Sequence, residues 1–450
     1  MPAYALEFLR DDGRTTSRRG RIVIMDDRVV ITGTGLISAI GNSPQEVWEA
    51  LLSGKHGIRR IEGFEPSGFA CRVGAWIKES AYSELSISPK DARVMDKHSY
   101  MLLKCTQDAF NTSCVDRASL SGDEVGFFAG MGMVDYNIAD LLPAVVQSRD
   151  VDGALDYGAF YSVAYREIYP LWPLAMMNNI AFCQVAIALG IRGENAVFSP
   201  HADSGAQAII EALETLRERK AEVALAGGVS EKISPVSLAR AHMVGILNTS
   251  NLEDQQLCRP FDRQRNGTVL GEGCGMLCLQ LQTSTENCKL SPKAVIAAHG
   301  SAFQLEESSY APTAKAIAQA MNNAIISAEL KPSDIDLVIA HGDGTVTGDK
   351  NETEALHRVF SGCLDKLKVF SSKGALGHLL AAAPPVDTIL AVSMLEHNMI
   401  PATLHVTGAD SNVEFNLVKE SPLKTKLNRI MINSQSHEGQ CQSLIIEALT

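Results

Sequence analysis

One stretch of the sequence combines a short apolar run, a sharp turn and the opening of a helix. It covers residues 196–210, AVFSPHADSGAQAII. A side chain at such a turn points toward a helix N-terminus, where the dipole lowers the pKa of a thiol and N–H donors can stabilise an oxyanion. The residue at this position is Ala202, which has no nucleophilic atom. The stretch therefore provides a setting for covalent acyl chemistry without the reacting group.

Two histidines and a lysine farther along the chain could support electrostatic or acid–base steps. His341 directly follows the apolar run 337–340, and Lys373 and His378 share the segment KGALGH. An imidazole at the carboxyl end of a strand can reach a cleft, and a neutral imidazole can donate to a developing oxyanion. A lone histidine is more often a structural residue. Even three such residues cannot replace an attachment point, because covalent acyl transfer needs a nucleophile.

The elements that must position these residues alternate between strands and helices. After the turn at Ala202, apolar residues recur at helical spacing to Leu216, and Asp203 or Ser204 is expected to cap that helix. The sequence SPQE at 43–46 predicts a capping box with proline at the first helical position. Further strands are expected at 29–32, 124–130, 222–228, 294–300, 337–340 and 368–370, and further helices at 92–111 and 313–330. Such alternation in both halves of the chain predicts an α/β fold.

Four motifs in this order resemble those of the β-ketoacyl-acyl carrier protein synthases, the condensing enzymes of fatty-acid and polyketide assembly. They are the stretch 196–210, CRPFDRQRNGTVLGEG at 258–273, HGDGT at 341–345 and KGALGH at 373–378. The resemblance runs from about Arg28 to Leu449. It implies a thiolase-like fold with two similar halves, 28–285 and 293–450, stacked as five α-β-α-β-α layers with the site between them. Residues 1–27 are expected to be a disordered extension, with Met25 as the natural start.

The resemblance also implies roles for the site residues. In this family a cysteine at the position of Ala202 holds the acyl chain. Two histidines, which match His341 and His378, promote decarboxylation of the malonyl extender and stabilise the enolate, and a lysine matching Lys373 orients one of them. With the cysteine missing, we expect these three positions to be vestigial.

Several positions depart from the family pattern. Asp343 stands where threonine is usual, and Pro384-Pro385 stands where glycine is usual, so the helix there is expected to restart with proline in its first turn. In the loop 433–439, Gln435 and His437 replace two phenylalanines of a gating loop. This loop is interpreted either as surface drift or as part of a loss of acyl transfer. The motifs RPFD and GEG are intact and are expected to hold the framework through Arg–Asp pairing and tight turns.

Three hypotheses for function remain open. The favoured one is a non-catalytic chain-length-factor subunit that pairs with a cysteine-bearing ketosynthase and works on acyl carrier protein. The first alternative is a malonyl-acyl carrier protein decarboxylase that uses His341 and His378. The second is an active ketosynthase whose cysteine was replaced by engineering, although Pro200, His201 and Asp203 are unusual neighbours for such a cysteine. Residues 131–169 have an irregular pattern with no firm element, and the resemblance implies that they form part of a dimer face and acyl channel.

Composition limits the partners and the compartment. The 450 residues are 46% hydrophobic and carry a net charge of −12, which argues against nucleic acid and anionic membranes as partners. An acidic carrier protein would need a local basic patch. The ten cysteines are scattered, and Cys274 and Cys278 lie in an apolar strand-like run, so we expect core cysteines, no metal or cofactor, and a cytoplasmic protein. Residues 1–27 contain Asp11 and Asp12 among five arginines, which is unlike a transit peptide.

Overall fold

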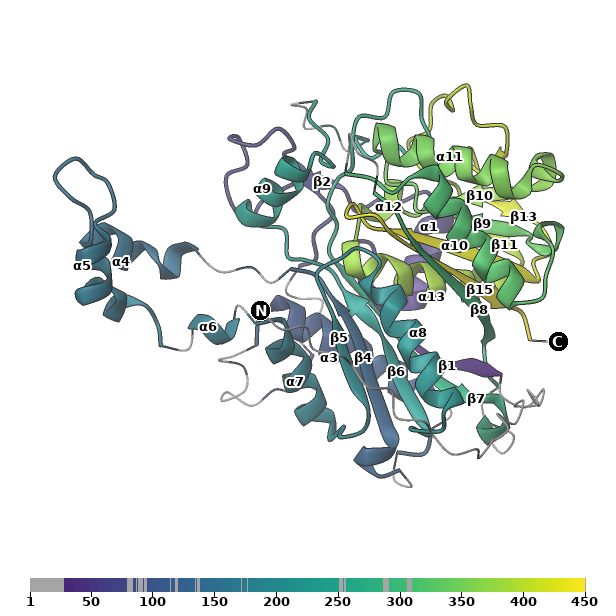
Figure 1. The fold of residues 1–450 in the computed structure, drawn as a ribbon, viewed down its shortest axis with the longest axis horizontal. Helices are drawn as coiled ribbons and strands as arrows, with labels where there is room; N and C mark the ends of the chain where they lie inside the picture. The colour runs from purple at the N-terminus through teal and green to yellow at the C-terminus, as the bar shows by residue number, and fades with distance from the viewer. Residues whose placement is uncertain are drawn as a thin grey trace, which may run out of the picture.

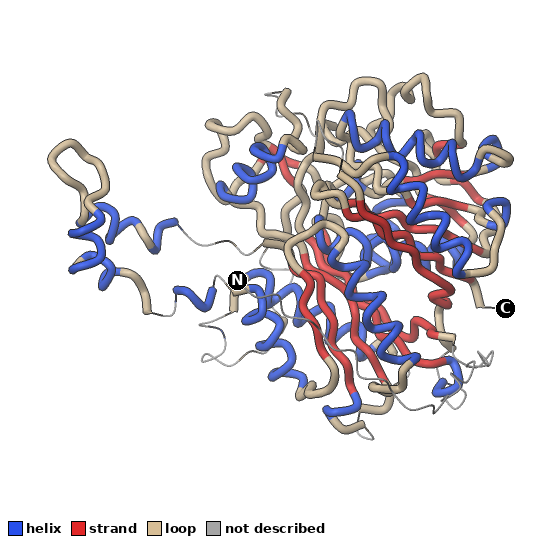
Figure 2. Tube along the Cα trace, viewed as in Figure 1, coloured by secondary structure: helices blue, strands red, loops and turns tan. Residues whose placement is uncertain are grey.

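A continuous 11-stranded ladder, which divides into two sheets where β1 pairs with β8, forms the frame of the molecule (Figures 1 and 2). The computed structural model describes residues 28–449 except 79–83, 86, 88–91, 93–94, 114, 118–119, 134, 136–137, 171, 176, 251–253, 255, 286–290 and 306–309. One sheet has the order β5-β4-β6-β7-β1 and the other β8-β15-β14-β9-β10-β12. They meet where Val29–Ile31 of β1 pair antiparallel with Ala294–Ile296 of β8.

The strands of the first sheet are β1 (Val29–Ser38), β4 (Val125–Met131), β5 (Asn195–Phe198), β6 (Val223–Val229) and β7 (Gly273–Leu281). Those of the second are β8 (Ala294–Phe303), β9 (Leu337–Ile339), β10 (Lys368–Phe370), β12 (Asn416–Leu417), β14 (Arg429–Gln435) and β15 (Gln440–Glu447). The pairs β4–β5, β4–β6, β9–β10 and β9–β14 are parallel. The strands expected from the sequence are therefore present, and five of the six lie within three residues of their expected bounds. The exception is β1, which continues beyond the expected end at 32 as far as Ser38.

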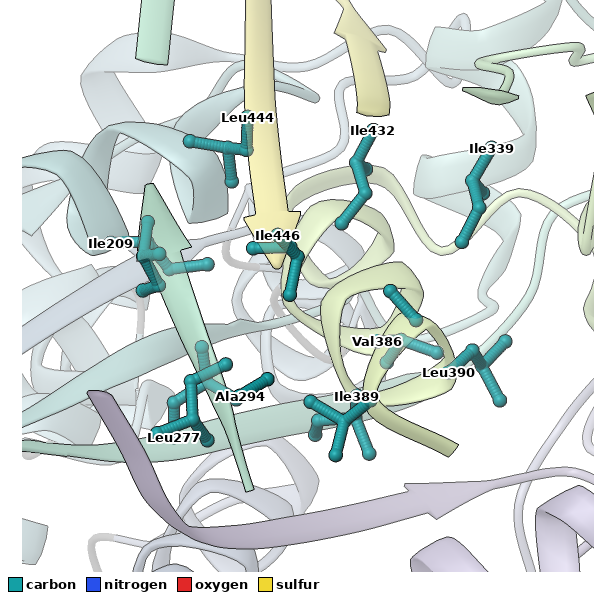
Figure 3. Close-up of a cluster of buried hydrophobic side chains, with 14 of the residues drawn as sticks. Ile209, Leu277, Ala294, Ile339, Val386, Ile389, Leu390, Ile432, Leu444 and Ile446 are labelled. Carbon is teal, nitrogen blue, oxygen red and sulfur yellow. The ribbon is translucent and has the colours of Figure 1, made fainter. Parts of the chain in front are cut away.

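The helices form three layers around these sheets. Side chains from both sheets pack on α8 (Ser204–Arg217) and α13 (Ala383–His397), as Figure 3 shows for Ile209, Leu277, Val386, Ile432 and others. The outer face of the first sheet packs on α3 (Lys97–Asn111) and α7 (Asn178–Leu189). The outer face of the second packs on α10 (Ala314–Ser327) and α11 (Val346–Phe360). The order helix, sheet, helix, sheet, helix confirms the predicted thiolase-like α/β fold of five layers.

Alternation of side chains along each strand explains this layering. In β7, Leu277, Leu279 and Leu281 face the central helices, whereas Cys274, Met276 and Cys278 face the outer layer. Strands with two covered faces are hydrophobic almost throughout, which is why their sequences read as short apolar runs. Cys274 and Cys278 are confirmed as core cysteines, and burial raises the pKa of Cys278 to about 11.

Helix starts follow their capping residues. In α1 (Pro44–Leu52) the Ser43 side chain accepts from Glu46 N, as predicted. The return bond of the predicted capping box goes to the preceding residue, because Glu46 Oε2 accepts from Asn42 N at 2.8 Å instead of from Ser43 N. In α13 the two prolines lie in the first turn, as predicted, where their missing N–H groups cost nothing. The start expected near residue 92 is wrong, because α3 begins at Lys97, after Asp96 accepts a hydrogen bond from Ser99 N.

An arm built from short helices extends from the body between β4 and α7. It contains α4 (Leu142–Gln147), α5 (Tyr157–Ser162) and a 3-10 turn at Ala164–Glu167, and α6 (Trp172–Ala175) follows. Figure 1 shows α4 and α5 at the left, away from the sheets. The expectation of no firm element at 131–169 is therefore wrong, because the helices bury Ala144, Ser148 and Ala164 against one another, a local packing too short to give a clear periodicity.

The remaining elements are short. The helices α9 (Pro235–Val244) and α12 (Lys373–Leu376) flank the site, and two small sheets pair β2 (Arg59–Arg60) with β3 (Val73–Gly74) and β11 (Met399–Ile400) with β13 (Leu423–Lys424). In the part of the chain that the structure describes, no helix combines the length and apolarity needed to cross a membrane. The extension expected at 1–27 lies outside the described residues.

Candidate functional site

The turn between β5 and α8 places Ala202 next to the first turn of a central helix. Ala202 is 2% exposed, and α8 begins at Ser204. Contrary to the sequence-based expectation, neither Asp203 nor Ser204 caps this helix: the Asp203 side chain makes no capping bond, and the Ser204 hydroxyl lacks a hydrogen-bond partner. Instead, Asp203 Oδ2 accepts from the amides of Gln207, at 2.7 Å, and Gln442, at 3.3 Å. These amides draw the carboxylate away from the backbone, and burial raises the pKa of Asp203.

His341 and His378 come together although they lie on different loops. Their ring centroids are 5.0 Å apart and the rings are nearly perpendicular. His341 Nδ1 accepts from Gln435 N and His378 Nδ1 accepts from Leu380 N, each at 3.3 Å. A backbone N–H can only donate, so in both neutral rings the proton sits on Nε2. Burial, followed by the charge of Lys373, holds the pKa of both histidines well below the usual value, so both rings are neutral at pH 7.

Lys373 lies behind this pair in an ion pair that the sequence reasoning did not single out. Its Nζ is 3.8 Å from Asp387 Oδ2, with side-chain exposures of 1% and 2%. Asp387 also accepts from the Ser372 hydroxyl at 2.6 Å. Burial raises the pKa of Asp387, and the charge of Lys373 opposes that rise. The structure thus places Lys373 where its charge acts on both imidazoles.

The loop 341–345 is held by two carboxyl groups of α11. Glu352 accepts from the backbone N–H groups of His341 and Gly342, at 2.9 and 2.8 Å, and Asp349 accepts from Gly344 N at 3.1 Å. Burial raises the pKa of both carboxyl groups. The sequence offered a signal for them, since both carboxyl groups follow the histidine motif within one helix.

Asp343 points its carboxylate toward the histidine pair. One oxygen, Oδ1, accepts from the N–H and hydroxyl of Thr345, at 2.8 and 2.7 Å. The other, Oδ2, lies 3.8 Å from His341 Nε2. The departure noticed in the sequence therefore puts a negative charge beside one of the two Nε2–H donors.

The loop between β14 and β15 closes over the same region. Gln435 and Ser436 are buried, and Gly439 turns the chain at φ +103°. The Glu438 carboxylate lies 2.8 Å from His437 Nε2 and accepts a hydrogen bond from the Ser436 hydroxyl. His201 Nδ1 lies 3.1 Å from the same carboxylate without forming a hydrogen bond. Burial alone would raise the pKa of Glu438, but these hydrogen bonds and charges lower it to about 2. The loop is thus a polar cross-link over the site rather than a surface segment.

Two neighbouring cavities meet at Ile246 and His437. The smaller, of about 20 Å³, is lined by His341, Asp343, His378 and Gln435 among others, and has space for about one water. The larger, of about 270 Å³, adjoins Ala202 and is lined mainly by apolar side chains of α9 and nearby loops. It also contains an ion pair, Arg240 Nη2 to Glu231 Oε2 at 3.1 Å. Among the described residues, the lining of neither cavity includes a cysteine.

The framework motifs hold the site, but not through the Arg–Asp pairing expected within RPFD. Arg259 pairs with Asp254 at 3.1 Å, whereas Asp262 Oδ2 accepts from the backbone of Thr407 and Gly408, at 2.7 and 2.9 Å. Glu272 accepts from Ile77 N and Ile233 N at 2.7 and 2.9 Å and pairs with Lys97. Within the described part of the chain, no group of three or more His, Cys, Asp or Glu side chains is arranged to hold a metal ion.

Two neutral histidines and a buried lysine lie between the two halves of a five-layer α/β fold. This combination of fold and site is the one that the resemblance to the condensing enzymes implies. The sequence matches the family Beta-ketoacyl synthase, N-terminal domain over residues 26–284 and Beta-ketoacyl synthase, C-terminal domain over residues 293–407. The chain belongs to the beta-ketoacyl synthase family.

Similar proteins and structures agree with this family. The 3-oxoacyl-[acyl-carrier-protein] synthase 2 of Coxiella burnetii is 26% identical over 424 residues, covering 93% of this chain and 98% of that protein. The protein of the same name from Vibrio harveyi is 28% identical and covers 94% and 99%. The solved ishigamide ketosynthase/chain length factor superposes with a TM-score of 0.81 at 22% identity, covering 94% of this chain and 99% of that one. A beta-ketoacyl synthase from Burkholderia phymatum gives 0.81 at 24%, covering 94% and 100%.

Proposed function

We propose that this chain is the non-catalytic, chain-length-factor subunit of a ketosynthase pair. The observation that carries the proposal is Ala202. It occupies the turn before α8, beside the larger cavity, where covalent acyl transfer would need a nucleophile. The nearest hydroxyl along the chain, that of Ser204, is 1% exposed and is not in the lining of either cavity. The histidines and lysine without a nucleophile are then remnants that keep the fold of the site.

An extended apolar surface supports a protein partner. Large side chains of the arm and of α7 are exposed to between 48% and 101%: Leu142, Val146, Val151, Tyr157, Tyr161, Val163, Tyr165, Tyr169 and Ile187. On the same side, β5 ends the sheet and pairs only with β4 among the described strands, so its other edge can accept a further strand. An apolar surface of this extent marks an interaction site. Obligate interfaces bury about 2,000 Å² or more.

The partner proposed for this surface is a ketosynthase that retains its cysteine, and acyl carrier protein is the proposed source of substrate. The solved ishigamide protein pairs a ketosynthase with a chain length factor. Another similar structure shows a type II PKS acyl-carrier protein in complex with its ketosynthase, at a TM-score of 0.78 and 22% identity. A homodimer of this chain would contain two sites without a nucleophile, whereas a heterodimer keeps one working site.

A second candidate function is malonyl-acyl carrier protein decarboxylation, which needs no cysteine. The geometry that favours it is the two Nε2–H groups of His341 and His378, which both border the smaller cavity and could stabilise an enolate. The position of Asp343 weighs against it, because its carboxylate lies beside one of those donors. Turnover of malonyl-acyl carrier protein by the isolated chain, abolished in His341→Ala, would select this alternative.

Co-expression with a cysteine-bearing ketosynthase from the same organism tests the proposal. We expect a 1:1 complex in size-exclusion chromatography, higher solubility than for the chain alone, and condensing activity only in the complex. A stable, soluble homodimer that does not bind the cysteine-bearing ketosynthase in pull-down experiments would contradict the proposal.

A further inference from the structure

The smaller cavity is lined by a carboxylate, that of Asp343, which changes the ligands that the cavity can bind. Its lining includes both imidazoles and Asp343. The tautomers fixed by Gln435 N and Leu380 N leave each Nε2–H free to donate. Asp343 Oδ2 stands 3.8 Å from His341 Nε2, longer than a direct hydrogen bond but close enough to attract that N–H group. A carbonyl oxygen in the cavity would have to compete with this carboxylate for the His341 donor.

The Asp343 carboxylate is held in place by its own contacts. Its Oδ1 accepts two hydrogen bonds from Thr345, which is itself the N-cap of α11 and accepts from Gly348 N at 3.1 Å. Asp343 is 7% exposed. Rotating the carboxylate away from His341 would therefore break its two hydrogen bonds to the N-cap residue of α11.

The two buried cations near these loops already lie beside carboxyl groups. Asp349, Glu352 and Asp387 are buried near the same loops, against the cations Lys373 and Arg265. Each of these cations lies within 4 Å of a carboxylate, Lys373 near Asp387 and Arg265 near Asp410 and Asp349. With space for about one water, the cavity offers little solvent to screen the Asp343 carboxylate from a ligand carboxylate.

We propose that Asp343 is a specificity-determining residue for thioesters held in the larger cavity: the carbonyl oxygen of an uncharged acyl thioester, about the size of one water, can reach the two Nε2–H donors of the histidine cavity, whereas Asp343 repels the carboxylate of a malonyl thioester. The inference rests on the proposed function, since it explains how the chain can keep its histidines in a complex without decarboxylating the extender. It adds a second reason for inactivity that is independent of Ala202. Replacing Asp343 should therefore change which thioesters bind, without restoring a nucleophile at position 202.

The test uses malonyl-pantetheine and acetyl-pantetheine as probes, with binding to the full chain measured by calorimetry. The native chain is expected to bind acetyl-pantetheine more tightly. Asp343→Asn keeps an Oδ1 acceptor for Thr345 and removes the charge, so it should raise the affinity for malonyl-pantetheine about tenfold, because a like charge no longer faces the ligand. The affinity for acetyl-pantetheine should change little. Asp343→Glu, which keeps the charge, is the matched control and should retain the preference for acetyl.

The outcomes separate this inference from the proposed function. A folded Asp343→Asn variant with no gain in malonyl affinity would overturn the inference, as would a native chain that binds both thioesters equally or neither of them. A second variant, Asp343→Thr, guards against a local effect of asparagine and should give the same gain. None of these results depends on whether the chain pairs with a ketosynthase, which size-exclusion chromatography of the co-expressed proteins measures separately.

Discussion

Lys373 Nζ lies 3.8 Å from Asp387 Oδ2, and both side chains are almost fully buried between the two halves of the molecule. Removal of one partner of such a pair leaves an uncompensated charge, which typically costs about 3–5 kcal/mol. We expect Lys373→Met to lower the free energy of unfolding by about 3 kcal/mol. The double variant Lys373→Met/Asp387→Leu should recover much of that loss. Urea denaturation of the four proteins of this cycle measures both effects, and a double variant as unstable as the sum of the single variants would show that the two residues are not coupled.

The exposed side chains of the arm should matter for assembly and not for folding. Tyr161 and Val146 are 70% and 62% exposed on α5 and α4. Tyr161→Glu and Val146→Glu are expected to weaken the complex with the ketosynthase about tenfold or more, because each puts a charge into an apolar contact. Ile326→Glu is the control: Ile326 is 72% exposed near the end of α10. Figure 1 shows α10 at the right of the molecule, whereas α4 and α5 lie at the left. Equal weakening by all three variants in a pull-down titration would argue against the arm as the interface.

His405 should make stability depend on pH. Burial and the nearby charges of His56 and Arg259 lower the pKa of His405 to about 4. The contact of His405 with the Cys258 carbonyl favours the protonated form and opposes this shift. Between pH 4 and the ordinary value near 6.5, the unfolded chain binds a proton that the folded chain does not, so stability falls as pH falls through this window. His405→Asn suits the positive φ of +69° at this position and removes the titrating group. The variant should lose part of the stability slope between pH 6.5 and 4 in denaturation measured at several pH values, and an unchanged slope would contradict the assignment.

Features set by local sequence could be predicted, and features set by distant partners could not. The strands, the turn at Ala202 and the prolines of α13 follow from apolar runs and turn chemistry within a few residues. The hydrogen bonding of the Asp203 side chain could not be predicted, because its partner Gln442 lies 239 residues away on β15. The same holds for Asp262, which is bonded to a loop 145 residues later instead of to Arg259.

The candidate site shows the same difference between features set by local sequence and features set by distant partners. The motifs indicated His341, Lys373 and His378, and the structure brings them together. Neither the Asp387 partner of Lys373 nor the direction of the Asp343 carboxylate was visible in the sequence, because both depend on how separate loops meet. The helices of the arm were missed because they are short and pack mainly on one another.

The absence of a nucleophile at position 202 is the central claim, and mass spectrometry of the acylated complex tests it most directly. The co-purified complex is incubated with an acyl-acyl carrier protein thioester, and both subunits are analysed intact and after trypsin digestion. We predict one acyl group for each heterodimer, bound to the cysteine of the ketosynthase, and none on the peptide 193–217 that contains Ala202 and Ser204. An acyl group on that peptide, in stoichiometric amount, would contradict the claim that this chain does not carry the growing product.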